Sequence, residues 1–454
     1  MTQKLFTAFE PLSSKQWKQQ IQFELKGADY TETLVWESPE GVKVKPFYHA
    51  DESVTKCQIP MPNGFKIIQN VFVHDVKKSN ERALDSLNRG AESIRFTIEN
   101  EAISLDELME NLPKENVTYY FNLLFLSAEF VKKVASFSSQ NQFEIVILQD
   151  TVGQLAKDGN WFVSLDKDFS EMKIISGLNF PFLSCKLEVY QNAGANIVQQ
   201  LAYAMAHVNE YFNRIENISS PITFEVSVGT HYFFEIAKLR ALRLLFNTLA
   251  KEYNHILDCQ ILAVPTKRNK TLYDYNVNML RTTTECMSAI LGGADAISNL
   301  AYDALYHKDN EFGDRIARNQ LLVLKHESYF NQVHNPADGA YYIESLTEQL
   351  AEKALALFKD IEANGGFITQ LIEGTIQRKI NESAQKEQDL FDSGKEVLLG
   401  TNKYPNKNDK MANDLELFPF VKNNPRKTLI TPIIERRLAE KMEQERLKSE
   451  VNDK

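Results

Sequence analysis

His231 and Asp303 are the two residues of this sequence best placed to act as an acid or a base. His231 follows the apolar, β-branched run 222–229, and Asp303 follows the run 296–302. An imidazole or a carboxyl group at the end of a strand can exchange a proton with a bound molecule. Either residue can instead be a polar loop residue that caps the next helix, and we favour this structural role for both.

Polar residues also follow other apolar runs. If the runs are parallel strands of a barrel, their carboxyl ends meet at one mouth, which is where barrel enzymes form their sites. We therefore expect a mouth lined by the residues at these ends, namely Tyr190-Gln191-Asn192, Gly229-Thr230-His231, Thr266-Lys267-Arg268 and Tyr302-Asp303.

The motifs that most directly predict enzymatic chemistry do not occur in the sequence. It holds no G-x-x-x-x-G-K-[ST] phosphate loop, no G-x-G-x-x-G after a strand and no G-x-S-x-G nucleophile turn. The eight histidines include no His-x-x-x-His pair, so no metal site is expected. The double glycines 292–293 and 365–366 follow helical runs and indicate helix ends. We assign no catalytic, cofactor-binding or metal-binding residue.

The composition is that of a globular protein with an acidic surface. The 454 residues include 43% hydrophobic and 25% charged side chains, and the net charge is -10. This charge argues against general nucleic-acid binding, which needs Lys and Arg opposite phosphates. No apolar run reaches the ~20 residues that span a bilayer, and the N-terminus has no secretory pattern. Four widely spaced cysteines, Cys57, Cys185, Cys259 and Cys286, predict reduced, buried thiols in a cytoplasmic protein.

From residue 65 onward, short β-rich runs alternate with helical stretches. The runs are 67–73, 93–98, 118–125, 143–149, 184–190, 222–229, 259–265 and 296–302. Eight apolar strands separated by helices predict an α/β fold, a closed (β/α)8 TIM-type barrel, with a doubly wound open sheet as the alternative. A further β-like run, 172–176, we place in a long insertion between the fourth and fifth strands.

The clearest helix spans 234–253 and has one apolar stripe. The residues of the stripe recur at helical spacing: Phe234, Ala237, Ala241, Leu245 and Leu249. The polar residues of the helix are expected to face away from the core: Lys238, Arg243, Asn247 and Lys251.

The two ends of the chain differ from the barrel repeat. We expect an N-terminal arm over residues 1–64, the barrel over 65–375, and a polar linker with a C-terminal helix over 376–454. The arm contains a helix with a capping box made by Ser13 and Gln16 and an apolar face of Trp17, Ile21 and Leu25. The final helix is expected to be capped by Thr431 and to be mostly solvated, with a thin stripe of Ile434, Leu438 and Met442.

A succession of longer motifs resembles the adenosylcobalamin-dependent acyl-CoA mutases, and methylmalonyl-CoA mutase in particular. The motifs are KPFY (45–48), QNAGA (191–195), FEIAKLRALR (234–243), RNKTLYD (268–274), NMLRTTTECMSAILGGAD (278–295), RIARNQ (315–320) and NPADGAYYIE (335–344). The resemblance covers residues 40–375 and is strongest over 185–365. It implies a (β/α)8 barrel whose channel accepts an acyl-CoA.

The chain departs from this family where catalysis would take place. Catalytic members resemble YHMQEAG at the end of strand five, where the histidine assists carbonyl polarisation. Here residues 188–194 read EVYQNAG, so Val189, or Gln191 if the alignment shifts, stands at the position of the histidine. The family's QND turn after strand four is replaced by DTVG at 150–153, and 174–185 holds no clear counterpart of its substrate-binding arginine. The cobalamin-binding Asp-x-His-x-x-Gly motif, carried by a C-terminal domain of working members, is absent, so we expect no cobalamin-binding domain.

A barrel with these departures resembles the small (beta) subunit of heterodimeric methylmalonyl-CoA mutase, and WKQQIQFELKG (17–27) is similar to the start of such a subunit. The resemblance implies a non-catalytic chain that binds no cofactor itself and pairs through its N-terminal helix with a large subunit. That subunit would bind adenosylcobalamin and interconvert methylmalonyl-CoA and succinyl-CoA. Two alternatives stay open: an acyl-CoA-binding barrel module, or a mutase substrate subunit that works with a separate cobalamin-binding chain.

Overall fold

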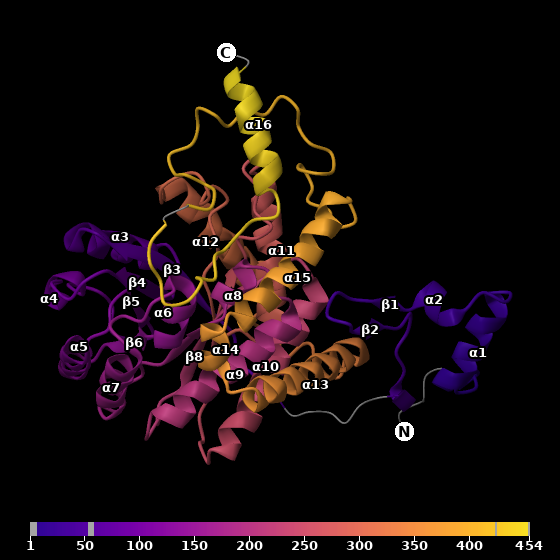
Figure 1. Cartoon of the computed structure of the whole chain (residues 1–454), viewed down its shortest axis with the longest axis horizontal. Coiled ribbons are helices and arrows are strands. Elements are labelled where there is room, and N and C mark those ends of the chain that lie inside the picture. Colours follow the sequence, from indigo (N-terminus) through magenta and orange to yellow (C-terminus); the bar gives the residue numbers. More distant parts are fainter. Residues whose placement is uncertain (1–6, 53–58, 423–424, 453–454) are drawn as a thin grey trace.

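A barrel of parallel strands forms the centre of the molecule (Figure 1). The structure is a computed structural model that describes residues 7–52, 59–422 and 425–452. The strands of the barrel are β3 (Lys66–Val73), β4 (Ser93–Ile98), β5 (Thr118–Leu123), β6 (Glu144–Leu148), β7 (Ser184–Lys186), β8 (Ile222–Val228), β9 (Cys259–Pro265) and β10 (Ala296–Ile297). They lie in the order β6-β5-β4-β3-β10-β9-β8-β7, and each neighbouring pair is parallel.

Backbone hydrogen bonds join the two ends of this sheet. Gln149 N donates to Phe182 O at 3.0 Å, and Ser184 N donates to Gln149 O at 3.0 Å. A parallel bridge between Gln149 and Leu183 lies at the same place. These contacts join the two edge strands, β6 and β7, whose outer backbone groups an open sheet would leave unpaired. The predicted (β/α)8 barrel is therefore confirmed, and the doubly wound alternative is wrong.

Helices surround the barrel and separate successive strands (Figure 1). The longer ones are α3 (Val76–Asn88), α5 (Ala128–Asn141), α9 (Ile197–Arg214), α10 (Tyr232–Glu252), α11 (Val277–Leu291), α12 (Glu311–His326) and α13 (Tyr341–Ala363). The shorter ones are α4 (Leu105–Leu108), α6 (Thr151–Asp158), α7 (Leu165–Ser176), α8 (Glu188–Asn192) and α14 (Phe367–Ile372). Beyond them lie α15 (Thr375–Asp392) and α16 (Glu440–Asn452).

The N-terminal arm reaches the barrel through a hairpin, and its α-helices stand away from the barrel (Figure 1). It contains α1 (Ser14–Glu24), α2 (Tyr30–Leu34), a hairpin of β1 (Trp36–Glu37) and β2 (Lys43–Val44), and the short 3-10 helix η1 (Ala50–Glu52). The predicted capping box is confirmed, since Ser13 Oγ accepts from Gln16 N and Gln16 Oε1 accepts from Ser13 N. The ring of Trp17 contacts Phe47 of the arm and is 47% exposed. The barrel therefore does not cover the apolar face of α1.

Two strands end earlier than their apolar runs predict. β7 stops at Lys186 and β10 at Ile297, so the predicted strands 184–190 and 296–302 are wrong at their carboxyl ends. After β7 the chain turns into α8, whose polar side chains hydrogen-bond to the residue that follows β9. These tertiary contacts override the β-propensity of the segment.

The run 172–176 is the last turn of α7 and not a strand. Phe169, Met172 and Ile175 of this helix are buried at a spacing of three residues. A window of five residues is too short to distinguish this helical period from a strand period. The run does lie in the insertion between the fourth and fifth barrel strands, as expected.

The C-terminal helix begins at Glu440 and not at Thr431. The preceding segment, residues 429–438, bonds to α6 and to the loop after β9: Ile433 N donates to Ala156 O at 2.8 Å and Leu438 N to Arg268 O at 2.9 Å. In a helix capped by Thr431, Leu438 N would donate to Ile434 O, so its bond to Arg268 O replaces an intrahelical hydrogen bond. Of the predicted stripe only Leu438 is buried, whereas the other two members are exposed.

Lys238 and Arg243 of α10 are buried, so the prediction that they face away from the core is wrong. The Lys238 ammonium lies 3.0 Å from Gln200 Oε1 and 2.7 Å from Ser227 O. Arg243 reaches Asp295 Oδ2 at 2.6 Å. Because α10 contacts α9, α11, α13 and β9, it has little free surface to solvate these charges. The predicted apolar stripe of this helix is buried and confirmed.

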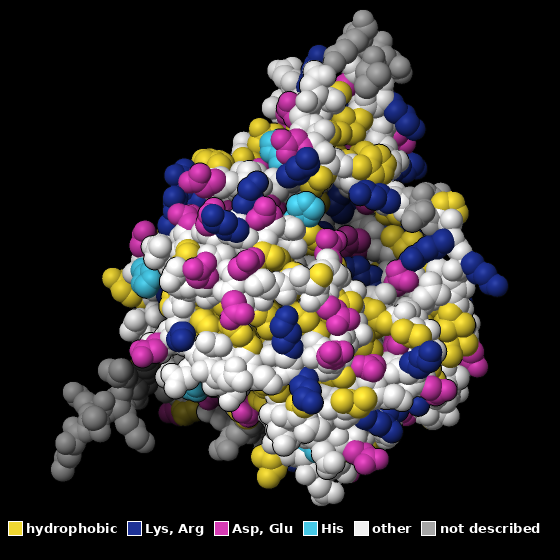
Figure 2. All heavy atoms as spheres, turned by 90° about the vertical axis from the view of Figure 1, so that its left-hand side faces the viewer, with side chains coloured by type: hydrophobic (Ala, Val, Ile, Leu, Met, Phe, Trp, Pro, Cys, Tyr) yellow, Lys and Arg dark blue, Asp and Glu magenta, His cyan; other side chains and the backbone are white. Residues whose placement is uncertain are grey.

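The buried cysteines and the charged surface agree with what the composition predicts. Cys185, Cys259 and Cys286 are free and buried, as predicted, and Cys57 lies outside the described residues. On the face shown in Figure 2, Lys and Arg side chains are interspersed with Asp and Glu. Within the described part of the chain, no helix is both long and apolar enough to cross a bilayer.

We expect Arg243→Ala to destabilise the protein by about 3 kcal/mol or more, because it removes the cation paired with the Asp295 carboxylate and the donor to two backbone carbonyls. Urea unfolding followed by circular dichroism measures the loss. Lys251→Ala, on the exposed side of the same helix, is the control and should change stability by less than about 0.5 kcal/mol. Equal losses in both variants would contradict the structural role of Arg243.

Candidate functional site

The carboxyl ends of β7, β8 and β9 meet, as expected, around one group of polar side chains. Thr266 Oγ1 lies 2.7 Å from Gln191 Oε1 and 2.9 Å from Asn192 Oδ1. Asn192 Oδ1 also accepts from Lys267 N at 3.0 Å. The structure thus brings Gln191 and Asn192 together with Thr266 and Lys267, as predicted, and these hydrogen bonds fix α8 against β9. Tyr190, predicted at the same mouth, is fully buried and contacts His207 instead.

His231 lies at the rim of this region but does not cap α10 through its side chain. Its ring stacks on the Trp36 indole, with ring centroids 5.4 Å apart and planes at 17°, and its centroid lies 4.1 Å from that of Phe234. Burial lowers the pKa of His231, against the opposing charges of Glu40 and Glu235. The imidazole therefore serves as a contact between the N-terminal hairpin and the barrel, and the predicted capping role is wrong for its side chain.

Asp303 is not part of the same site. It is buried after β10, where Asn310 Nδ2 donates to its Oδ2 at 2.8 Å and His307 Nδ1 lies 3.2 Å away. Asn310 is in turn the N-cap of α12. Asp303 therefore supports the start of the next helix, which agrees with the structural role that we favour from the sequence.

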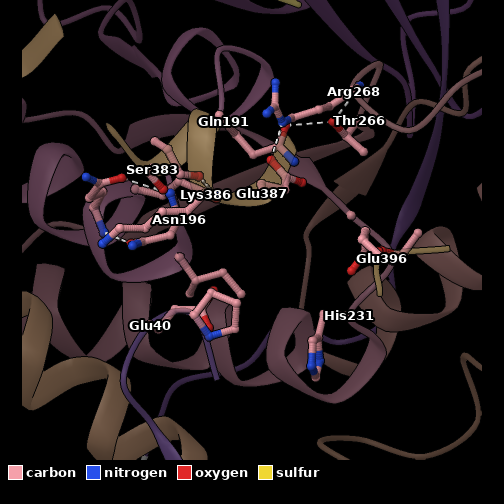
Figure 3. Close-up of a pocket in the computed structure, with 18 of the residues that line it drawn as sticks. Glu40, Gln191, Asn196, His231, Thr266, Arg268, Ser383, Lys386, Glu387 and Glu396 are labelled. Atoms are coloured by element: carbon pink, nitrogen blue, oxygen red, sulfur yellow. Dashed lines mark hydrogen bonds and ion pairs between the residues drawn. The ribbon is translucent and has the colours of Figure 1, made fainter. Parts of the chain in front are cut away.

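A cavity of about 360 Å3 opens beside these strand ends, between the barrel, α15 and the N-terminal hairpin (Figure 3). Gln191, Thr266 and Arg268 lie along one wall and His231 lies on another. Seven further residues with ionisable side chains that sequence reasoning did not select also line it, among them Glu40, Lys386 and Glu396. No local motif marks these three, because they come from the hairpin, from α15 and from the segment after α15.

Val189, which stands where the resemblance places the family's histidine, is a buried core residue of α8. Its isopropyl group can neither donate a hydrogen bond nor carry a proton. The other residue considered for that position, Gln191, engages its carbonyl oxygen with Thr266. Neither of the two supplies an acid or a base at the mouth of the barrel.

The interior of the barrel is occupied by side chains. Its apolar part is a cluster of inward-facing residues: Ile68, Tyr120, Val146, Leu148, Leu262 and Ala296. Arg95 of β4 forms an ion pair with Glu225 of β8, and both side chains are buried. In the strand order, β4 and β8 are separated by three strands in either direction around the closed barrel, so this pair spans its diameter.

A second buried cluster seals the end of β6. Asp150 Oδ1 accepts from Tyr211 OH at 2.6 Å and lies 2.9 Å from His207 Nε2, while Tyr190 OH contacts His207 Nδ1 at 2.9 Å. Burial raises the pKa of Asp150, but the charge of His207 and the hydrogen bonds from His207 and Tyr211 outweigh it and hold the pKa at about 2. Because the carboxylate is buried and fully engaged, it ties β6 to α9 and does not face a ligand.

Comparison with known proteins points to one family. The family model for methylmalonyl-CoA mutase matches residues 139–448. The methylmalonyl-CoA mutase small subunit of Porphyromonas gingivalis is 33% identical over 445 residues, which cover 89% of this chain and 71% of that one. The mitochondrial methylmalonyl-CoA mutase of Bos taurus is 26% identical over 470 residues, covering 88% of this chain and 62% of that protein.

A solved structure, the substrate-liganded L-Ala-D/L-Glu epimerase from Bacillus subtilis, aligns with a TM-score of 0.31 and 7% identity over 53% of this chain and 55% of that chain. The barrel assignment itself follows from the strand order and the closing hydrogen bonds described above.

We expect Asp150→Asn to cost about 2 kcal/mol of unfolding free energy at pH 7. The folded-state pKa of Asp150 is lowered, so the carboxylate stabilises the fold above pH ~4, and this contribution is lost as the pH falls toward ~2. Urea unfolding of both proteins at pH 7 and pH 3 should show a smaller difference at pH 3. The exposed Asp106→Asn is the control. A difference that stayed constant with pH would rule out this linkage.

Proposed function

The chain belongs to the methylmalonyl-CoA mutase family, and we propose that it is the small, non-catalytic subunit of a heterodimeric methylmalonyl-CoA mutase. In this proposal a large subunit binds adenosylcobalamin and interconverts methylmalonyl-CoA and succinyl-CoA by a radical mechanism. The similarity to the Porphyromonas gingivalis small subunit, over most of both chains, supports the assignment to a subunit.

The Arg95–Glu225 ion pair is the observation that carries the non-catalytic part of the proposal. A substrate that threads a barrel needs an open axis, whereas this pair crosses the axis from one side of the wall to the other. Tyr120 and its apolar neighbours fill the barrel beside it. Opening the channel would expose an unpaired buried charge, which is costly. This argument also disfavours the acyl-CoA-binding module.

The residues at the end of β7 support the same proposal. A mutase that polarises a carbonyl group needs a proton donor or a cation beside it, because charge develops on that oxygen. Val189 offers neither, and the amide of Gln191 has neither the charge nor the transferable proton of an imidazole. A mutase substrate subunit that works with a separate cobalamin-binding chain would still need a proton donor or a cation at this position. We therefore favour the non-catalytic subunit over that alternative.

The described residues do not fit a corrinoid lying against the carboxyl ends of the strands. The segment 429–438 is bonded there through Arg436 N to Asn192 O and Leu438 N to Arg268 O. Leu438 and Ala439 are buried by these contacts. We therefore propose that adenosylcobalamin is bound by the large subunit, and we derive no step of the reaction from this chain.

The N-terminal arm is our proposed contact with the large subunit. Phe9, Trp17 and Phe23 are 75%, 47% and 80% exposed on a segment that projects from the barrel (Figure 1). Aromatic side chains on a projecting element are typical of the anchors that carry binding energy at protein interfaces. The capping box and the contact of Trp17 with Phe47 order α1 before any partner binds.

Co-expression with the cognate large subunit should yield a 1:1 complex with mutase activity, whereas this chain alone should show none with adenosylcobalamin and methylmalonyl-CoA. Size-exclusion chromatography and a coupled assay of each chain and of the pair measure this. Turnover by the isolated chain would refute the argument from Val189. Saturable binding of succinyl-CoA to it without turnover would favour the binding module.

The double variant Trp17→Ala/Phe23→Ala should weaken the complex by at least tenfold in Kd, because it removes two exposed aromatic anchors of the arm. Ile256→Ala is the control, since this residue is fully exposed on a barrel loop far from the arm in the sequence. Surface plasmon resonance with immobilised large subunit measures both. Unchanged affinity of the double variant would exclude α1 from the interface.

A further inference from the structure

The cavity beside α15 contains charges that the protein does not pair. Five carboxylates and three permanent cations line it, together with His231. Some are paired: Arg268 with Glu387, Lys379 with Glu382 at 3.3 Å, and Glu235 with the neighbouring Lys238 at 2.5 Å. The charged side chains left over are Glu40, Glu396 and Lys386, which come from three separate segments.

The two leftover carboxylates lack partners in the part of the chain that the structure describes. Glu40 Oε2 is buried and accepts no hydrogen bond, and the charge of Glu40 acts on His231, whose pKa burial nevertheless lowers. Glu396 forms neither a hydrogen bond nor an ion pair through its side chain, and burial together with the charge of Glu387 raises its pKa. A half-buried carboxylate without a partner loses part of its hydration, and a cation beside it would recover part of that cost.

The cavity also contains an amide donor and an ammonium group that have no partner among the described residues. Gln191 is 8% exposed, and its Oε1 accepts from Thr266, while its Nε2 donates to no acceptor among the described residues. The Lys386 ammonium likewise has no partner in the described part of the chain, and lies on the side of the cavity opposite Glu396 in Figure 3. A buried amide donor and a free ammonium are groups that bind a carboxylate.

We propose that this cavity binds a small zwitterion with one ammonium and one carboxylate group, such as a free α- or ω-amino acid. Its ammonium group lies between the Glu40 and Glu396 carboxylates. Its carboxylate accepts from Gln191 Nε2 and pairs with Lys386. A volume of about 360 Å3 suits a molecule of this size and lies at the small end of the usual range for ligand sites.

The N-terminal hairpin completes the site by supplying Glu40. The hairpin is held to the barrel by the Trp36–His231 stack, by buried Val42, and by Lys43 N, which donates to Gln349 Oε1 at 3.3 Å. The site lies beside the barrel axis and uses none of the residues that would contact a large subunit through α1. Binding of the zwitterion and pairing with a large subunit are therefore separate properties.

Isothermal titration calorimetry of the full-length chain tests the proposal with glycine, 4-aminobutyrate and 6-aminohexanoate, which carry one ammonium and one carboxylate group at three different separations. Butylamine and butyrate, each carrying one of the two charges, are the comparison ligands. At least one zwitterion should bind saturably and at least tenfold more tightly than either comparison ligand, because two charged contacts are lost in each. Glu40→Gln and Glu396→Gln should each weaken its binding about tenfold, and Lys386→Ala should weaken it as well.

Glu373→Gln is the matched control, since it removes the same charge just before α15 but outside the cavity. It should bind the zwitterion like the unchanged protein. The absence of saturable binding for all three zwitterions would overturn the proposal, as would binding that Glu40→Gln and Glu396→Gln leave unchanged. Butylamine binding as tightly as the zwitterion would overturn the role of Gln191 and Lys386. If Glu40→Gln lowers the melting temperature, Glu396→Gln and Lys386→Ala decide the outcome.

Discussion

The Arg95–Glu225 ion pair inside the barrel is the constraint on which the packing of the barrel interior depends. A buried pair of charges is tolerated only when both partners remain in place and water is excluded, because either charge alone would be strongly destabilised. The pair joins strands on opposite sides of the wall and lies beside the apolar cluster around Tyr120. In a barrel built in this way, side chains that stabilise the fold occupy the centre, and this supports our proposal that no long substrate threads it.

The buried charges on α10, in the layer of helices around the barrel, are likewise paired with specific acceptors. Arg243 binds the carboxylate of Asp295 and two backbone carbonyls, and Lys238 binds the end of β8. These cations satisfy acceptors that the strand ends leave free, where an apolar side chain would leave them unpaired. The helix is therefore held to the barrel by specific polar contacts as well as by its apolar stripe, and the position of the strand ends beside the cavity depends on it.

The parts outside the barrel differ in how they use it. The C-terminal segment is bonded to the loops at the carboxyl ends of the strands, whereas α1 leaves its aromatic residues exposed. The N-terminal hairpin contacts the barrel through Trp36, which stacks on His231, and it also lines the cavity through Glu40. This arrangement separates a surface suited to a protein partner from a cavity suited to a small charged molecule.

The sequence by itself determined what depends on neighbouring residues. The capping box at Ser13, the apolar stripe of α10 and the order of strands and helices follow from local spacing, and the family motifs predicted the barrel. The ends of β7 at Lys186 and of β10 at Ile297 could not be predicted from local spacing, because contacts between distant segments decide where these strands stop.

Only the tertiary structure decided which charged residues are buried and which remain without a partner. Lys238 and Arg243 look like solvated helix residues until the strands that accept their hydrogen bonds are in place. Glu40, Lys386 and Glu396 meet in one cavity although no motif links them. Periodicity records which side of a helix or strand a residue occupies, but pairing and burial depend on what that side faces, and that is fixed by contacts between residues far apart in the chain.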